Sequence, residues 1–258
     1  MLFSAWLAAA LLMQALWFLA RRHQDAGIVD VGWALSLGGM AVFYALAGEG
    51  SPIQRLAAGS VGGLWGLRLG VHLLLDRVVG KPEDGRYRFL REHWGDRADF
   101  QFLWFFQLQA LVAAVLSVPF LLAAGNPANE LVVVQWVGLG LFVLAKFGET
   151  VADRQLASFR ARPENRGQTC RLGLWRYSRH PNYFFEWLVW FAFAAVAWPA
   201  PGGGWALIMP GLMYVLITRV SGIPYTEAQA IRSRGDDYRR YQRSTSPLIP
   251  WFPKEDLT

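Results

Sequence analysis

Long apolar runs alternate with short polar segments along the whole chain, and this pattern is the strongest signal in the sequence. Seven such runs can be drawn, at residues 2–20, 27–47, 60–78, 102–124, 131–147, 181–199 and 204–222. A helix of roughly 20 residues crosses a hydrocarbon core about 30 Å thick. We therefore expect an all-α integral membrane protein with seven transmembrane helices in a single membrane-embedded domain over residues 1–258.

Basic residues fall mostly on one side of these runs. Of the 25 Lys and Arg residues, only Arg55 lies in the loops after the second, fourth and sixth runs. The positive-inside rule then places the other loops in the cytoplasm, with the N-terminus outside and the C-terminus cytoplasmic. Because positive charges follow the run at 2–20 instead of preceding it, we interpret that run as a transmembrane helix and not as a signal peptide.

Composition narrows the class of protein further. The chain is 54% hydrophobic with a net charge of +6, and its mean hydropathy is +0.24. The basic residues lie between apolar runs, so membrane topology explains them and nucleic acid is not an expected partner. One cysteine, Cys170, gives neither an intramolecular disulfide nor a metal-site spacing. The sequence also lacks glycine-rich nucleotide motifs, so any nucleotide must be bound by helices and loops.

Residues 173–186 concentrate polar side chains at the start of a predicted helix whose first residue is a proline. Asn182 and Glu186 are four apart and share one face of that helix. Arg179 and His180 precede the helix, where free N–H groups and the helix dipole favour an anion. This pattern predicts a phosphate- or carboxylate-binding corner. The alternative is a membrane-surface anchor, which would not need polar groups directed into a span.

A second polar stripe lies on residues 149–162, which we predict to continue the helix of the fifth run. Glu149, Asp153, Leu156 and Arg160 follow a 4-3-4 spacing and therefore share one helix face. The carboxylates can accept hydrogen bonds from the ribose or adenine of a cofactor. The alternative is a solvated face with an internal ion pair.

Ionisable residues inside the apolar runs are further candidates. Arg68 and His72 lie one turn apart in the third run, and Asp30 lies early in the second. Such residues within a membrane indicate a functional site by default, and histidine can deliver a proton near neutral pH. A structural pairing of His72 with Asp30 or Glu186 is the alternative. The charged loop 83–88 either closes over a cofactor or is a solvated turn.

The C-terminal tail is predicted to contain one polar helix. Residues 226–243 are polar, with Tyr238 and Tyr241 three apart, and Pro247 and Pro250 end the helix. This tail is expected on the same side of the membrane as residues 148–180.

Several stretches together carry a family resemblance, namely residues 25–33, 83–87, 105–110, 149–156 and 173–186. Over its whole length the chain resembles the bacterial membrane branch of the steroid 5-alpha-reductase family. That resemblance implies a seven-span enzyme of the bacterial inner (plasma) membrane, with its cofactor site facing the cytoplasm. It also implies NADPH-dependent reduction of an activated carbon–carbon double bond, as in an enone, a 3-oxo-Δ4-steroid or another lipid.

The resemblance also implies roles for particular residues. Asp153 and Arg160 match the Asp and Arg, with the same spacing of seven, that hold the adenosine part of NADPH in that family. Asn182 and Glu186 match its Asn and Glu near the nicotinamide. Position 149 is Asn in the steroid enzymes and Glu here.

The substrate half departs from the family pattern. The Gln-Glu pair of the second span is missing, and the family's substrate-binding Tyr of the third span corresponds to His72. His72 assisted by Asp30, or Tyr87, would then polarise the carbonyl while hydride passes to the β-carbon. The substrate need not be a steroid.

The last third of the chain also resembles the isoprenylcysteine-type and phospholipid methyltransferases, which use S-adenosylmethionine. Arg179-His-Pro-Asn-Tyr183, Glu227 and Tyr238-Arg-Arg-Tyr241 carry that similarity. A lipid or prenyl methyltransferase is therefore the alternative enzyme. A third hypothesis is a non-catalytic protein whose polar helix start binds anionic lipid head groups.

We expect the substrate side in spans of about 1–124 and the cofactor portion at about 146–258, with the lipid bilayer and a hydrophobic small molecule as partners. No metal is expected. The predicted catalytic residues are His72, Asp30 and Tyr87. The predicted cofactor-binding residues are Glu149, Asp153, Leu156, Arg160, Tyr177, Arg179, His180, Asn182, Tyr183, Glu186, Arg68, Arg88, Glu227 and Tyr238.

Overall fold

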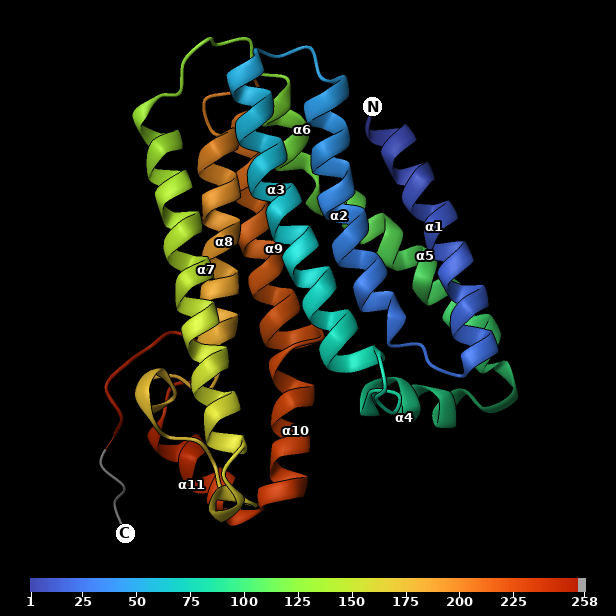
Figure 1. The fold of residues 1–258 in the computed structure, drawn as a ribbon, viewed down its shortest axis with the longest axis vertical. Coiled ribbons are helices and arrows are strands. Elements are labelled where there is room, and N and C mark those ends of the chain that lie inside the picture. The colour runs from blue at the N-terminus through green and yellow to red at the C-terminus, as the bar shows by residue number, and fades with distance from the viewer. Residues whose placement is uncertain (255–258) are drawn as a thin grey trace. The chain divides into compact units, whose positions relative to one another are not determined.

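The computed structural model describes residues 1–254, and all regular secondary structure within them is helical (Figure 1). The all-α class is therefore confirmed. The longer helices are α1 (Leu2–His23), α2 (Ile28–Ala47), α3 (Pro52–Leu73), α4 (Gly85–Trp94), α5 (Ala98–Leu116), α6 (Val118–Ala124), α7 (Val133–Arg160), α8 (Pro181–Ala197), α9 (Ile208–Val215), α10 (Ile223–Arg234) and α11 (Asp236–Ser244). Short 3-10 or π segments are η1 (Leu74–Val78), η2 (Gly95–Arg97), η3 (Pro163–Asn165), η4 (Gly173–Arg176), η5 (Gly203–Leu207) and η6 (Leu216–Val220).

Six helical stretches within residues 1–254 are long and apolar enough to cross a membrane. They are Leu2–His23, Ile28–Ala47, Pro52–Val78, Gly85–Ala124, Val133–Arg160 and Gly203–Arg234. Helix α8 is almost wholly apolar but has 17 residues, just short of that length. The chain thus has the composition of an integral membrane protein. The seventh span and the orientation of the termini stay predictions.

The chain divides into two compact units. Unit 1 contains residues 1–136 and 193–206, and unit 2 contains residues 137–192 and the chain from Leu207 onward. The expected substrate portion, about 1–124, and cofactor portion, about 146–258, stay predictions. Helix α8 itself crosses the division, because its residues from Phe193 belong to unit 1.

In unit 1, α2 and α3 run side by side (Figure 1) and approach closely through glycines. A Cβ atom at Gly38 would lie 2.9 Å from Cα of Gly66, and one at Gly66 would lie 2.5 Å from Cα of Gly38. Small residues of this kind let helix backbones approach in a membrane, where close packing replaces the hydrophobic effect between helices. Gly38 and Gly66 therefore set the spacing of the two helices.

Buried amides hold unit 1 together at a second place. Gln54 of α3 and Gln135 of α7 are fully buried. Gln135 donates through Nε2 to Gln54 Oε1 at 2.6 Å and to the carbonyl of Val196 at 2.9 Å. Each amide is satisfied by the other, as burial in an apolar region requires.

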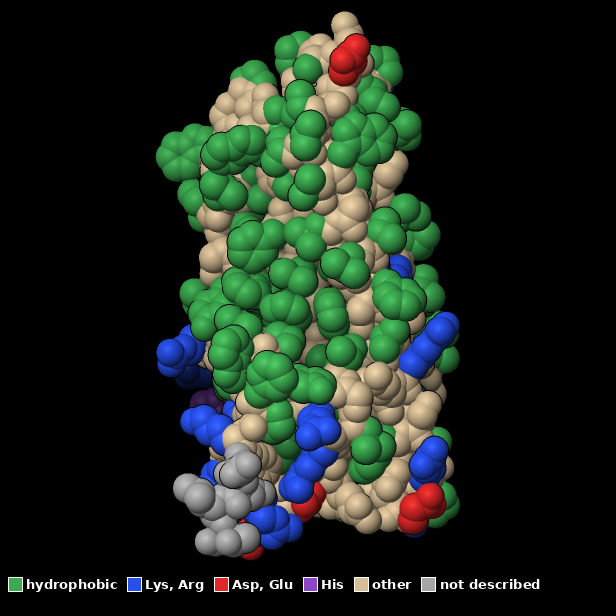
Figure 2. Space-filling view, turned by 90° about the vertical axis from the view of Figure 1, so that its left-hand side faces the viewer, with side chains coloured by type: hydrophobic (Ala, Val, Ile, Leu, Met, Phe, Trp, Pro, Cys, Tyr) green, Lys and Arg blue, Asp and Glu red, His purple; other side chains and the backbone are tan. Residues whose placement is uncertain are grey.

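In unit 2, α8 packs against both α7 and α9. The ring of Phe185 on α8 lies against Gly148 of α7, where a side chain would overlap it. Two residues further on and on the other side of α8, Trp187 donates its indole N–H to the carbonyl of Pro210 in α9 at 2.9 Å. On the side of the molecule where α7 is drawn, apolar side chains cover most of the surface and Lys and Arg gather toward one end (Figure 2).

Three predicted helix boundaries were wrong. The tail helix expected at 226–243 breaks at Gly235, whose φ of +53° suits glycine, so α10 and α11 are separate. The run expected at 102–124 is divided into α5 and α6 at Ser117. Pro119, two residues further on, has no N–H to continue the helix. The third helix begins at Pro52, earlier than the predicted residue 60. The predicted continuation of the fifth run as a helix through 149–162 is confirmed as far as Arg160.

The close approach of α2 and α3 predicts that Gly38→Ala will lower the free energy of unfolding by about 1–3 kcal/mol, because the added methyl group overpacks the interface. Gly39→Ala is the matched control, since a Cβ at Gly39 meets no atom within 4 Å. Melting temperatures of both variants in the same detergent check this. Equal melting temperatures for the two variants would contradict it.

Candidate functional site

Polar side chains on α7 and α8 meet within unit 2. Asn182, in the first turn of α8, donates through Nδ2 to Asp153 Oδ1 on α7 at 3.2 Å. One turn further along α8, Glu186 Oε2 lies 3.3 Å from Lys146 Nζ, which also pairs with Glu149. We call these five residues the α7–α8 ladder. The structure therefore brings together the two polar faces that were predicted separately, at 149–160 and 182–186.

The charge of the ladder decides which ligand groups fit there. Its three carboxylates outnumber the one ammonium group of Lys146. Carboxylates accept hydrogen bonds from hydroxyl and amine groups and repel phosphate. The ladder thus suits the nucleoside parts of a cofactor and not its phosphates. Arg160 is exposed at the end of α7, on the same helix face as Glu149 and Asp153.

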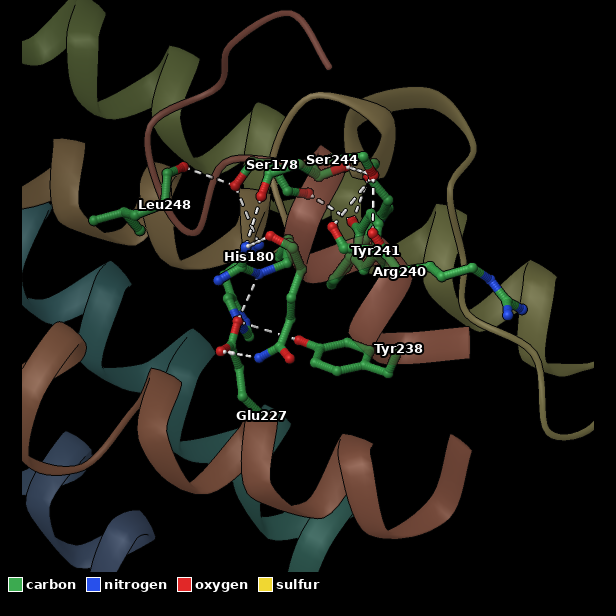
Figure 3. Close-up of polar contacts among 12 residues, drawn as sticks. Ser178, His180, Glu227, Tyr238, Arg240, Tyr241, Ser244 and Leu248 are labelled. Atoms are coloured by element: carbon green, nitrogen blue, oxygen red, sulfur yellow. Dashed lines mark hydrogen bonds and ion pairs between the residues drawn. The ribbon is translucent and has the colours of Figure 1, made fainter. Parts of the chain in front are cut away.

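Arg179 and His180 have a different role from the predicted anion corner, because both contact Glu227 of α10 (Figure 3). Arg179 donates through Nε to Glu227 Oε1 at 2.6 Å and through Nη1 to the carbonyls of Gln242 and Thr245 at 2.9 and 2.6 Å. His180 Nε2 lies 3.3 Å from the same Glu227 oxygen. These contacts occupy the guanidinium that was expected to bind an anion.

Two residues of α11 complete the set around Glu227. Tyr238 donates its hydroxyl to Oε1 at 3.3 Å, and Gln242 donates through Nε2 to Oε2 at 2.7 Å. We call Arg179, His180, Glu227, Tyr238 and Gln242 the tail network. Burial lowers the pKa of His180, although Glu227 opposes that shift. The imidazole is therefore neutral at pH 7 and can donate Nε2–H to the carboxylate.

Hydrogen bonds hold residues 175–178, which precede α8, against α7 on one side and the C-terminal tail on the other. Trp175 donates its indole N–H to the carbonyl of Ala152 on α7 at 2.9 Å. Ser178 donates its hydroxyl to the carbonyl of Leu248 at 2.7 Å, and Tyr241 donates to the carbonyls of Trp175 and Ser178 (Figure 3). Burial raises the pKa of Tyr241, so its hydroxyl stays a donor. These bonds position the start of α8 between α7 and the tail.

A second polar cluster lies in unit 1, around Asp30 at the start of α2. Tyr87 of α4 donates its hydroxyl to Asp30 Oδ1 at 2.7 Å, and Arg86 donates through Nη2 to Oδ2 at 2.8 Å. Arg77 Nη1 lies 3.8 Å from Oδ2. We call these residues, with Asp84, the Asp30 cluster. Tyr87 is 3% exposed and packs edge-on against two aromatic rings of α5.

Asp84 is the N-cap of α4 and orients Arg86, one of the residues that contact Asp30. Its carboxylate accepts the backbone N–H of Arg86 at 2.9 Å and the Nε of the same residue at 3.1 Å. Burial alone would raise the pKa of Asp84, but Arg86 and Arg77 together lower it below its ordinary value. Asp84 is thus a charged helix cap at neutral pH.

Among the described residues, His72 and Asp30 do not form a hydrogen bond or an ion pair with each other. The side chain of His72 is exposed on α3, and the Asp30 carboxylate is occupied by Tyr87 and Arg86. The expected pairing of His72 with Asp30 is therefore replaced by a Tyr87–Asp30 pair. Of the other predicted residues, Arg68 and Leu156 are half-buried on α3 and α7, and Arg88 is exposed on α4.

The two predicted tyrosines at the start of α8 face the tail. The ring of Tyr183 stacks on His180 with centroids 5.3 Å apart, and its hydroxyl lies 3.2 Å from Thr226 Oγ1. Tyr177 is exposed and its ring meets Phe252 edge-on.

Sequence reasoning missed three residues that hold these sites together. Lys146 lies three residues before Glu149, and this spacing was a usable signal for a shared helix face. Arg86 adjoins Tyr87 in the charged loop, which gave a weaker signal. Gln242 gave none, because its partner lies on another helix.

A family model described as a protein of unknown function, DUF1295, matches residues 16–245. The chain belongs to the DUF1295 family. The DUF1295 match covers the α7–α8 ladder, the tail network and the Asp30 cluster. No curated protein matches the chain, and no solved structure matches it.

The tail network predicts that Glu227→Gln will unfold the C-terminal segment locally. The side chains of Arg179 and Glu227 are 10% and 15% exposed, and breaking one partner of a buried pair costs about 3–5 kcal/mol. Hydrogen exchange of residues 236–254, followed by mass spectrometry, should become faster in this variant.

Asp236→Asn is the control for that experiment. It removes the exposed pair of Asp236 with Arg239, whose side chains are 81% and 58% exposed, and such pairs contribute little. Exchange as slow in Glu227→Gln as in Asp236→Asn would show that Glu227 does not hold the tail.

Proposed function

We propose that this DUF1295 protein is an NADPH-dependent membrane reductase of an activated carbon–carbon double bond in a lipid-like substrate, similar to the steroid 5-alpha-reductases. The observation that carries the proposal is the Asn182–Asp153 contact of 3.2 Å. It brings the two residue sets that resemble that family's cofactor motif onto adjacent helix faces. A cofactor lying across α7 and α8 would then touch both sets.

The donors and acceptors of the ladder fit the nucleoside parts of NADPH. Glu149 and Asp153 can accept hydrogen bonds from ribose hydroxyls, and the Asn182 amide has a second hydrogen for the carboxamide. Arg160, exposed beyond the carboxylates, suits a phosphate group. Bound NADPH supplies the hydride, and the chain's residues hold and orient the cofactor.

The acid that polarises the substrate carbonyl is better assigned to Tyr87 than to His72. Tyr87 is buried and its hydroxyl is held by Asp30 at 2.7 Å, whereas His72 is exposed. A hydrogen-bond donor removed from water stabilises developing charge more strongly than an exposed one. In this assignment the Tyr87 O–H would turn from Asp30 to the substrate carbonyl and give it the proton, and Asp30 is the positioning residue that holds the hydroxyl when no substrate is bound.

The second candidate is an S-adenosylmethionine-dependent methyltransferase of a lipid or prenyl acceptor. It is favoured by one observation: Arg179, His180, Glu227 and Tyr238, which carry that resemblance, lie together in the tail network. Their polar groups are satisfied by one another, however, which argues for a structural role.

The cofactor proposal predicts that purified protein in mild detergent binds NADPH, measured by calorimetry. Arg160→Gln should lower that affinity about tenfold or more, the effect of losing a charge-assisted bond to phosphate. Arg154→Gln is the matched control, because Arg154 lies on another face of α7. Binding of S-adenosylmethionine with no NADPH binding would overturn the reductase in favour of the methyltransferase.

The acid assignment predicts that Tyr87→Phe binds NADPH normally but oxidises it about 10²-fold more slowly, the usual contribution of a general acid. A 3-oxo-Δ4-steroid is the first probe substrate, and NADPH absorbance gives the rate. His72→Gln is the comparison variant. A normal rate in Tyr87→Phe with a large loss in His72→Gln would return the acid role to His72.

A further inference from the structure

A cavity of about 350 Å³ opens on unit 2, between α7 and the loop that follows it. We call it the outer groove. Its floor is mostly apolar and it carries two arginines. The residues that line it are Val151, Arg154, Gln155, Ser158, Phe159, Arg162 and Leu172.

The outer groove lies on the opposite face of α7 from the ladder. Successive residues of an α-helix turn by about 100°, so Val151 and Ser158 project about 140–180° away from Glu149 and Asp153. The groove is therefore separate from the proposed cofactor site. Neither the reductase nor the methyltransferase proposal uses it.

Specific bonds build the outer wall of the groove. The backbone N–H of Leu174 donates to Gln155 Oε1 at 2.9 Å. Gly173 has a φ of +57°, and a side chain there would overlap Gln155, so the loop lies directly on the helix. Asn165 donates through Nδ2 to the carbonyl of Phe159 at 2.7 Å. These contacts hold Leu172 over the apolar floor.

An exposed apolar stripe of α7 leads directly into the groove. Val137, Val143, Leu144 and Phe147 are all exposed, Phe147 by 67%. They lie on the same helix face as Val151, which follows Phe147 by one turn. Apolar side chains cover this side of the molecule and Lys and Arg gather at one end of it (Figure 2). An exposed stripe on a helix that can cross a membrane is the surface that lipid chains cover.

The position of Arg154 matches the level of a lipid phosphate. At 1.5 Å per residue, Arg154 lies about 10 Å along the helix from Phe147. The polar head-group layer begins at the edge of the hydrocarbon core and is roughly 5–8 Å deep on each side. A long arginine side chain reaches back toward that layer. Arg162, just past the end of α7, also lines the groove and adds a second positive charge.

We propose that the outer groove binds one anionic phospholipid. Its acyl chain lies along the exposed stripe of α7 and over Val151, and its phosphate lies at Arg154. Arg162 attracts the negative charge of the head group, as basic pockets at the membrane surface do. A soluble nucleotide would leave the apolar stripe that enters the groove uncovered, so the lipid fits the whole surface better.

Native mass spectrometry of the full chain tests this. The protein is reconstituted in nanodiscs of equimolar phosphatidylglycerol and phosphatidylethanolamine, released, and its bound lipids are identified. Wild type should retain phosphatidylglycerol in preference to phosphatidylethanolamine. Arg154→Gln should reduce that retention about fivefold, the effect of one basic residue at an anionic surface, and the double variant with Arg162→Gln should reduce it further.

Arg160→Gln is the matched control, because it removes the same charge from the ladder face of α7. It should keep the lipid while losing NADPH affinity, so the two proposals can fail separately. Equal retention of both lipids by wild type, or unchanged retention in the double variant, would overturn the lipid site. Loss of NADPH binding in the double variant would assign the groove to the nucleotide instead.

Discussion

The buried ion pair of Arg179 with Glu227 is the contact on which the architecture of unit 2 depends most. Removing two charges from water is costly unless further hydrogen bonds satisfy them. Here the carboxylate has four partners, and the guanidinium also bonds two carbonyls near the end of α11. The pair joins the start of α8 to α10 and to the tail. It thereby fixes where Asn182 and Glu186 lie against α7.

Local pattern predicted the start of α8 at Pro181 and the shared face of Glu149 and Asp153, because both follow from helix geometry. The partner of Arg179 could not be predicted, since Glu227 lies 48 residues away and no spacing rule connects them. The exposure of His72 could not be predicted for a related reason. Periodicity places a residue on a helix face, but the rotation of α3 in the bundle decides whether that face is buried or exposed.

Helix α7 has two polar faces that carry different groups. One face carries the carboxylates of the ladder, and the other carries Arg154 at the end of an apolar stripe. A membrane helix that continues into water can carry both kinds of group. Its apolar part fixes how deep the helix lies in the bilayer, and the polar part beyond it can present different side chains on different faces. If both proposals hold, separate faces of this kind would keep a negatively charged cofactor away from lipid phosphate of the same sign.

The choice between the two enzyme classes depends on phosphate. The α7–α8 ladder has more carboxylates than cations. Carboxylates accept hydrogen bonds from ribose hydroxyls and also attract a sulfonium cation, so the ladder fits both NADPH and S-adenosylmethionine. Arg179 and His180 are satisfied by Glu227 and offer no cation to a pyrophosphate. NADPH carries phosphates and S-adenosylmethionine carries none. A reductase therefore needs an arginine outside the tail network to bind these phosphates. Arg160, on the ladder face of α7, is the residue that a reductase would need and a methyltransferase would not.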